Sequence, residues 1–193
     1  RVRALKLGAA VRPPPDPIQA ARFGPRLVIP MPLYVGLDSS TQSLTAVVVE
    51  ITRDARRVVL ETALHFDEAF PDYATRNGVL PDPDPAVGIA PPLMWAEALD
   101  VMMARIEESG VDVRQIAAIT GSAQQHGSVY LNANASTILA ALDPTQPLVG
   151  QLRGVFSRKT SPMWMDSSTA EECGEITAAV GGERELARHT GSR

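Results

Sequence analysis

Cysteine and histidine are scarce in this sequence of 193 residues. Cys173 is the one cysteine, so the chain has no disulfide framework and no cysteine-based metal site, which favours a reducing compartment. The three histidines, His65, His126 and His189, are too few and too scattered to indicate a zinc site.

Long hydrophobic runs are missing as well. No apolar stretch approaches the length of a membrane span, so we expect no membrane partner. The net charge of −4 argues against nucleic acid as a partner. With 45% hydrophobic and 21% charged residues, the composition is that of an ordinary globular domain with a core of its own.

The amino-terminal stretch lacks serine and has a single acidic residue, Asp16. It holds six basic residues and six prolines within residues 1–30, without sustained periodicity. This pattern predicts a disordered, basic, proline-rich leader over residues 1–32 and a folded part over 33–193. Arginine enrichment leaves an organellar transit peptide open, although the missing serine argues against it. A non-native upstream extension is the other alternative.

The folded part begins with three β-like segments. Alternating or continuous apolar residues predict strands over 33–37, 44–51 and 58–66, with a charged turn at 53–57 between the second and third. Consecutive strands joined by short turns predict an antiparallel meander. Residues 67–92 follow as a long loop rich in proline and aspartate, and such loops are usually functional or disordered.

A helix is predicted after this loop, within residues 91–110, with Gly110 at its end. Its expected core face is formed by Leu93, Ala96, Leu99, Met103 and Ile106. A short buried strand over 116–122, a possible strand over 128–132 and a helix capped by Ser168 complete the pattern. Together these elements predict an α/β fold with a mixed sheet and flanking helices.

The turn after the first strand carries a carboxylate and hydroxyls where a hairpin would usually have glycine. Its residues are Asp38, Ser39, Ser40, Thr41, Gln42 and Ser43. Backbone N–H groups and hydroxyls can bind nucleotide phosphates, and a carboxylate can hold Mg²⁺ through water. A phosphate-binding turn is thus one interpretation, and a plain serine-rich hairpin with an Asx-turn is the other.

Two further stretches carry polar groups that suit a sugar. Gln124, Gln125 and His126 follow the strand over 116–122, and donors and acceptors of this kind can surround the hydroxyls of a polyol or keto-sugar. A surface loop with a satisfied histidine is the alternative. Farther on, Trp164 is either an apolar wall for a sugar or a core residue, and Asp166 either contacts substrate or holds its loop.

Three motifs resemble one family in the same order. "YVGLDSSTQSLTAVVVEI" (34–51), "TGSAQQHGSVYLN" (120–132) and "PMWMDSSTAEEC" (162–173) are similar to motifs of the FGGY carbohydrate kinases, particularly the eukaryotic-type xylulose kinases. Ser40 and Thr45 depart from the glycine and lysine that are common in the family at these positions. The resemblance implies a ribonuclease H-like lobe of the actin, hexokinase and Hsp70 type, truncated at its carboxyl end.

The resemblance also implies a function. It is ATP-dependent phosphorylation of D-xylulose to D-xylulose 5-phosphate in the cytoplasm, with Mg²⁺ as cofactor and the missing carboxyl-terminal lobe required for activity. Cofactor binding then falls to residues 38–42, with Asp38 at the metal, and substrate binding to Gln125, His126, Trp164 and Asp166. The resemblance places the catalytic base and the adenosine site outside this chain. Another sugar specificity (L-ribulose or a polyol) and a non-catalytic sugar- or phosphate-binding module remain alternatives.

Overall fold

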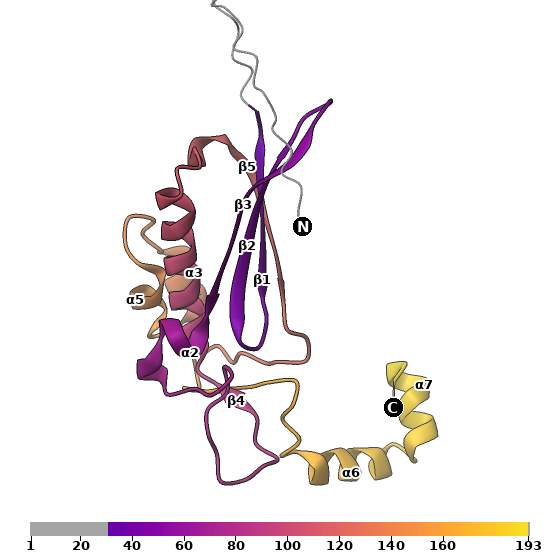
Figure 1. Ribbon diagram of the computed structural model, residues 1–193. Helices are drawn as coiled ribbons and strands as arrows, with labels where there is room; N and C mark the ends of the chain where they lie inside the picture. The colour runs from indigo at the N-terminus through magenta and orange to yellow at the C-terminus, as the bar shows by residue number, and fades with distance from the viewer. Residues whose placement is uncertain (1–30, 193) are drawn as a thin grey trace, which may run out of the picture. The chain divides into compact units, whose positions relative to one another are not determined.

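A mixed β-sheet organises the folded part of the chain (Figure 1). The computed structural model describes residues 31–192, so all but the last two residues of the leader predicted over residues 1–32 lie outside the described residues. The strands run in the order β3-β2-β1-β5. Their bounds are Leu33–Ser39 for β1, Ser43–Ile51 for β2, Arg56–His65 for β3 and Ile116–Ala123 for β5. The antiparallel meander β1-β2-β3 and the parallel pair β1-β5 confirm the predicted mixed-sheet α/β class.

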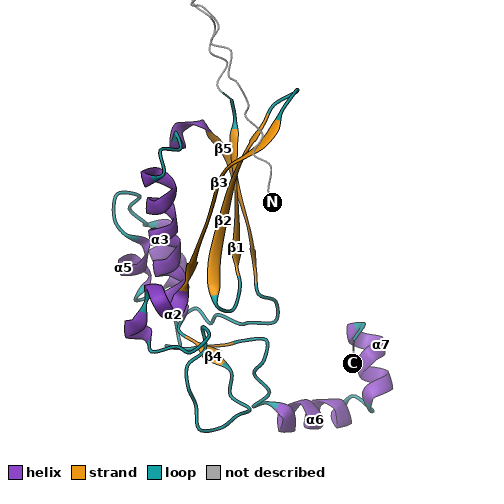
Figure 2. Ribbon diagram, in the orientation of Figure 1, coloured by secondary structure: helices purple, strands orange, loops and turns teal. Residues whose placement is uncertain are grey.

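The core lies between this sheet and helix α3 (Pro92–Glu108), which lies beside the sheet in Figure 2. Every second residue of β2 is buried, which is the period expected for a strand with one face on a core. Met94 and Met102 of α3 and Phe66 are fully buried in the same cluster. Burial of each such side chain stabilises the fold by roughly 1.5–3 kcal/mol. The methionines are thus core residues.

The buried stripe of α3 differs from the predicted one. Of the five predicted residues, Ala96 and Ile106 are buried, but Leu93, Leu99 and Met103 are only half-buried. Met94, Ala98 and Met102, which are also buried, form a row with Ile106, each four residues apart. The helix is apolar over a wide arc, so its sequence does not define which part of the arc faces the sheet. Gly110 follows the helix with φ of 84°, as predicted for a glycine that ends a helix.

The strand predicted over 116–122 is present as β5, but the prediction that it is buried was wrong. Its residues after Ile116 are exposed, and Ile119 keeps 54% of its surface accessible. Among the described strands, β5 pairs only with β1, and α3 packs on β2 and β3 instead. The apolar composition therefore predicted the strand correctly, but it did not predict whether other elements bury that strand.

The segment predicted as a long loop contains ordered elements. Helix α2 (Phe66–Ala69) and the 3₁₀ helix η1 (Pro71–Tyr73) come first, and strand β4 (Ile89–Ala90) closes the segment. β4 pairs antiparallel with β6 (Ser161–Pro162), which brings two segments about seventy residues apart in sequence together. This pairing places the segment that contains Trp164 next to the end of the segment predicted as a loop, residues 67–92.

Two smaller predictions were also wrong. No strand forms over 128–132; only an isolated bridge joins Leu131 to Phe156. Helix α6 begins at Ala170 with Thr169 at its N-cap, while the hydroxyl of Ser168 donates to Asp166 instead of capping the helix. The remaining elements are η2 (Val113–Gln115), α4 (Ala135–Ala140), α5 (Leu148–Leu152), α6 (Ala170–Ala179) and α7 (Glu183–Thr190). Among the described helices, none combines the length and the apolar character that crossing a membrane would require.

Candidate functional site

The turn between β1 and β2 is closed by a serine side chain. Ser40 Oγ accepts hydrogen bonds from the N–H groups of Gln42 (3.4 Å) and Ser43 (3.2 Å), and the Ser40 N–H donates to the Ser43 carbonyl at 2.9 Å. A hydroxyl that takes up turn amides explains how the turn forms without glycine. Within the described residues the Thr41 N–H has no partner, so it is the turn amide available to a ligand.

Asp38 stands near the end of β1 with its side chain exposed. Its cross-strand neighbours are Thr45 on β2 and Ser122 on β5, and Ser122 Oγ donates to Asp38 Oδ1 at 2.5 Å. This bond orients the carboxylate, and Oδ2 receives no hydrogen bond from residues 31–192. The sequence interpretation did not include Ser122; its position at the end of a strand parallel to β1 is the feature that could have identified it.

The loop predicted to meet a sugar is anchored at both ends. The Gln124 N–H donates to the Ser39 carbonyl at 2.9 Å, and the Ser128 N–H donates to the Pro162 carbonyl at 3.0 Å. Between these anchors Gln125 and His126 are exposed, and no described residue hydrogen-bonds either side chain. His126 has φ of 60°, a left-handed conformation that is uncommon outside glycine. Such strain is concentrated at functional sites.

Trp164 contacts the turn directly. Its indole Nε1 donates to Thr41 Oγ1 at 3.0 Å, and 55% of its surface remains exposed. This exposure rules out the core-tryptophan alternative for the described part of the chain. The bond fixes the indole edge against the turn and leaves ring surface available for an apolar contact.

Asp166 holds two loops together. Its Oδ2 accepts the N–H of buried Gly88 at 2.9 Å, and its Oδ1 accepts the Ser168 hydroxyl at 2.7 Å and the Ser168 N–H at 3.2 Å. The bonds from Ser168 and Gly88 favour the charged form, so the pKa of Asp166 lies below its ordinary value. The geometry supports the loop-holding interpretation of this residue.

These contacts bring the three motifs to one end of the sheet. Ser122 and Gln124 bond the end of β1, Trp164 bonds the turn that follows β1, and Ser128 bonds Pro162 just ahead of Trp164. The side chain of Ser39 does not lie with the other predicted phosphate-site groups. Its neighbour Asp38 is on the opposite side of the strand, because successive side chains alternate, and Ser39 lines a pocket on the α3 side of the sheet.

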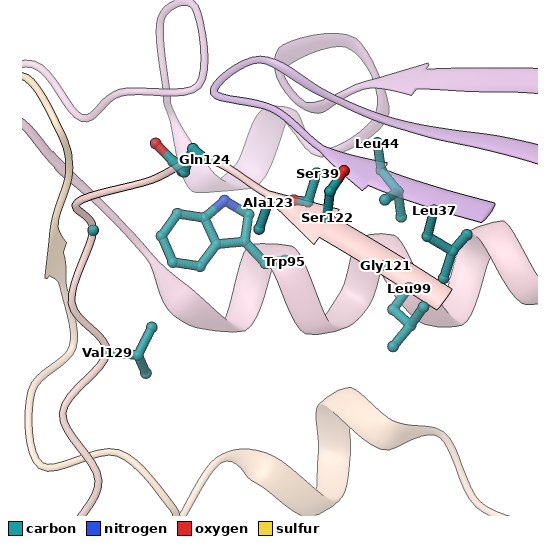
Figure 3. Close-up of a pocket in the computed structure, with 11 residues that line it drawn as sticks. Leu37, Ser39, Leu44, Trp95, Leu99, Gly121, Ser122, Ala123, Gln124 and Val129 are labelled. Carbon is teal, nitrogen blue, oxygen red and sulfur yellow. The ribbon is translucent and has the colours of Figure 1, made fainter. Parts of the chain in front are cut away.

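That pocket, of about 430 Å³, is mainly apolar (Figure 3). Trp95 and Gln124 lie near one end and Leu37, Leu44 and Leu99 near the other. Within residues 31–192, neither Trp95 Nε1 nor Gln124 Oε1 has a hydrogen-bond partner, although both atoms are buried. Asp38 and His126 do not line the pocket, whereas Ser39 and Gln124 do, so the pocket borders the predicted site.

Metal binding by protein side chains alone does not fit this site. Among the described residues there is no group of three or more histidine, cysteine, aspartate or glutamate side chains that could hold a metal ion. Asp38 offers a single carboxylate with one unpaired oxygen. This donor set suits Mg²⁺ that keeps its waters and reaches the protein together with phosphates.

Comparisons with known proteins find xylulose kinases among the relatives of this chain. No family model matches the chain. It is 44% identical to xylulose kinase 2 of Arabidopsis thaliana over 166 residues, which are 85% of this chain and 29% of that protein. It is 42% identical to xylulose kinase of Mus musculus over 159 residues, which are 82% of this chain and 28% of that protein. The chain belongs to the FGGY carbohydrate kinase family.

A solved FGGY kinase structure supports the fold. The ligand-bound xylulose kinase of Lactobacillus acidophilus superposes with a TM-score of 0.53 at 15% identity, covering 81% of this chain and 24% of that one. At this identity the likeness shows the fold alone, and it confirms the predicted actin- and hexokinase-like class. The chain spans less than a third of the length of the curated FGGY kinases that it matches.

Proposed function

We propose that this chain is the part of an ATP-dependent D-xylulose kinase that carries the phosphate turn and the sugar loop. The observation that supports this most is the convergence of the three motifs at one sheet end, through the Gln124–Ser39 and Trp164–Thr41 hydrogen bonds. The relatives named xylulose kinase support the choice of sugar. The remainder of the proposed enzyme, with the catalytic base and the adenosine site, is assigned to sequence outside this chain.

The phosphate turn of this proposal comprises residues 38–42. Bound Mg-ATP would supply the phosphoryl group and a cation that offsets its charge. Asp38 would hold the hydrated metal through its open oxygen while Ser122 keeps the carboxylate oriented. Within the described residues, the donors left for phosphate in this turn include the Thr41 N–H, the Thr41 hydroxyl and the exposed Gln42 side chain, and Ser40 shapes the turn. Ser39 contributes its backbone.

The sugar side of the proposal rests on the loop around His126. Gln125 and His126 present exposed polar groups that no residue in the described part of the chain hydrogen-bonds, so they can hydrogen-bond the hydroxyls of an open-chain ketose. Trp164 offers an apolar ring surface from the segment that Ser128 joins through the Pro162 carbonyl. Asp166, whose oxygens are engaged by Gly88 and Ser168, positions this segment.

The test is steady-state kinetics of the complete gene product that contains this chain, with xylulose and Mg-ATP. Asp38→Asn is nearly isosteric but removes the charge, so kcat should fall on the order of a hundredfold while xylulose binding without nucleotide stays close to wild type. A kcat within about threefold of wild type would show that the turn has no role in phosphate binding.

Parallel assays address the alternatives. A higher kcat/KM for L-ribulose or a polyol than for xylulose would change the assigned sugar but not the reaction. Sugar binding without any phosphoryl transfer by the complete wild-type product would favour the non-catalytic module.

A further inference from the structure

A second turn, at Asn77 and Gly78, packs against the phosphate turn. The carboxylate of Asp67 stabilises this second turn. Asp67 lies in α2, directly after the buried Phe66. Its Oδ1 accepts the Thr75 hydroxyl at 2.7 Å and the Gly78 N–H at 3.0 Å, and its Oδ2 accepts the Asn77 N–H at 2.5 Å. Three donors from one short segment thus converge on a single side chain.

The segment whose N–H groups hydrogen-bond Asp67 is a tight two-residue turn. Arg76 and Val79 exchange both backbone hydrogen bonds, at 2.7 and 3.1 Å. Asn77 and Gly78 between them both have positive φ, 54° and 77°, as in a type I′ turn. Left-handed conformations at two successive residues need support, and the bonds from their N–H groups to Asp67 provide it.

This tight turn lies directly against the phosphate turn. A Cβ atom on Gly78 would lie 1.9 Å from the Thr41 carbonyl oxygen and 3.2 Å from Gln42 Cα, so the two backbones touch at this point. The Phe66 N–H donates to the Gln42 carbonyl at 2.9 Å, which ties the start of α2 to the same residues. The carbonyl side of the phosphate turn is therefore held by α2 and the turn around Gly78.

We propose that Asp67 is a positioning residue for the phosphate turn, acting through the Asn77–Gly78 turn on the backbone of Thr41 and Gln42. The proposal rests on the proposed function. Asp67 touches no reacting group; it fixes the position of the Thr41–Gln42 peptide within the phosphate turn. Burial raises the pKa of Asp67, but the bonds from Thr75, Gly78 and Asn77 together hold it below its ordinary value, so the carboxylate stays charged at neutral pH.

Substitution of Asp67 by asparagine tests this in the complete gene product. The amide keeps one acceptor and places an NH₂ group against at least one donor, so the turn around Gly78 loosens. A phosphate site displaced by a fraction of an ångström loses rate, and we expect kcat to fall on the order of tenfold, with a raised KM for ATP and an unchanged KM for xylulose. Thr75→Val, which removes one donor of three, should show the same pattern more weakly.

Asp100→Asn is the matched control. Asp100 also receives two backbone N–H groups, from Leu148 and Val149 at 3.0 and 2.9 Å, but these belong to α5 and not to the phosphate turn. The variant Asp100→Asn should therefore leave kcat and the KM for ATP unchanged. If Asp67→Asn and Thr75→Val leave both constants within twofold of wild type, or change them no more than Asp100→Asn does, Asp67 is not a positioning residue.

Amide hydrogen exchange separates this inference from the proposed function. Exchange in a peptide spanning residues 38–44 should become faster in Asp67→Asn and in Thr75→Val but not in Asp100→Asn, whether or not the protein turns over a sugar. An inactive wild-type protein would overturn the proposed function alone. Unchanged exchange in both Asp67→Asn and Thr75→Val would overturn the role of Asp67, even in an active enzyme.

Discussion

Replacement of Asp166 by asparagine decides whether this residue holds its loop or contacts substrate. The carboxylate now receives the Gly88 N–H on one oxygen and the Ser168 hydroxyl and N–H on the other. Asparagine has a single side-chain acceptor, so it can satisfy only one of these two sides. On the other side its NH₂ group would face a donor.

The expected loss follows from the burial of Gly88. An unpaired buried N–H costs about 1–3 kcal/mol, and the half-exposed position of Asp166 places the effect in the lower half of this range. We therefore expect Asp166→Asn to lower the free energy of unfolding by about 1–2 kcal/mol, and Asp166→Ala by somewhat more, because alanine satisfies neither side.

The assay is equilibrium unfolding in urea at neutral pH, with Asp143→Asn as the control. Asp143 accepts the N–H and hydroxyl of Thr145, two residues on, as Asp166 does with Ser168, but it has no bond comparable to that from Gly88. The control should change the free energy of unfolding by less than about 0.5 kcal/mol. An unchanged free energy of unfolding in Asp166→Asn, combined with a raised KM for xylulose, would refute the loop-holding interpretation and indicate direct substrate contact.

Three further predictions concern the sugar, acid stability and the leader. His126→Ala should lower kcat/KM for xylulose by the equivalent of roughly 1–3 kcal/mol, and an unchanged kcat/KM would remove His126 from the sugar site. The folded-state pKa values of Asp67 and Asp166 lie below the ordinary 3.8, so their stabilisation is present above that pH and declines as pH falls through the folded values. Urea unfolding across pH 2–7 should show a shallower acid decline in the double variant Asp67→Asn/Asp166→Asn than in wild type, and identical declines would contradict this. Deleting residues 1–30, which have few apolar residues in register, should leave the thermal midpoint nearly unchanged, whereas a drop of several degrees would show that they pack on the domain.

The sequence by itself determined the elements whose causes are local. Alternating apolar residues define β1 and β2, and the helical apolar period with Gly110 behind it defines α3. Both follow from side-chain periodicity, which depends only on neighbours in the chain. The three motifs also indicated the family before any geometry was known.

Burial was decided by tertiary structure. The same apolar residues of α3 could face the sheet along either of two stripes, and packing on β2 and β3 selected the stripe of Met94, Ala98 and Met102. Likewise an apolar segment predicts a strand, but whether that strand is covered depends on which elements lie next to it. Strand β5 is apolar and exposed for this reason.

The contacts of the candidate site were also decided by tertiary structure, because they join residues far apart in sequence. Ser122 reaches Asp38 across 84 positions only through the parallel register of β1 and β5, and Trp164 reaches Thr41 across 123 positions. The residue types suggested phosphate and sugar chemistry. The pairing of strands determined which of them meet, since a one-residue change of register would turn each side chain to the opposite face of the sheet.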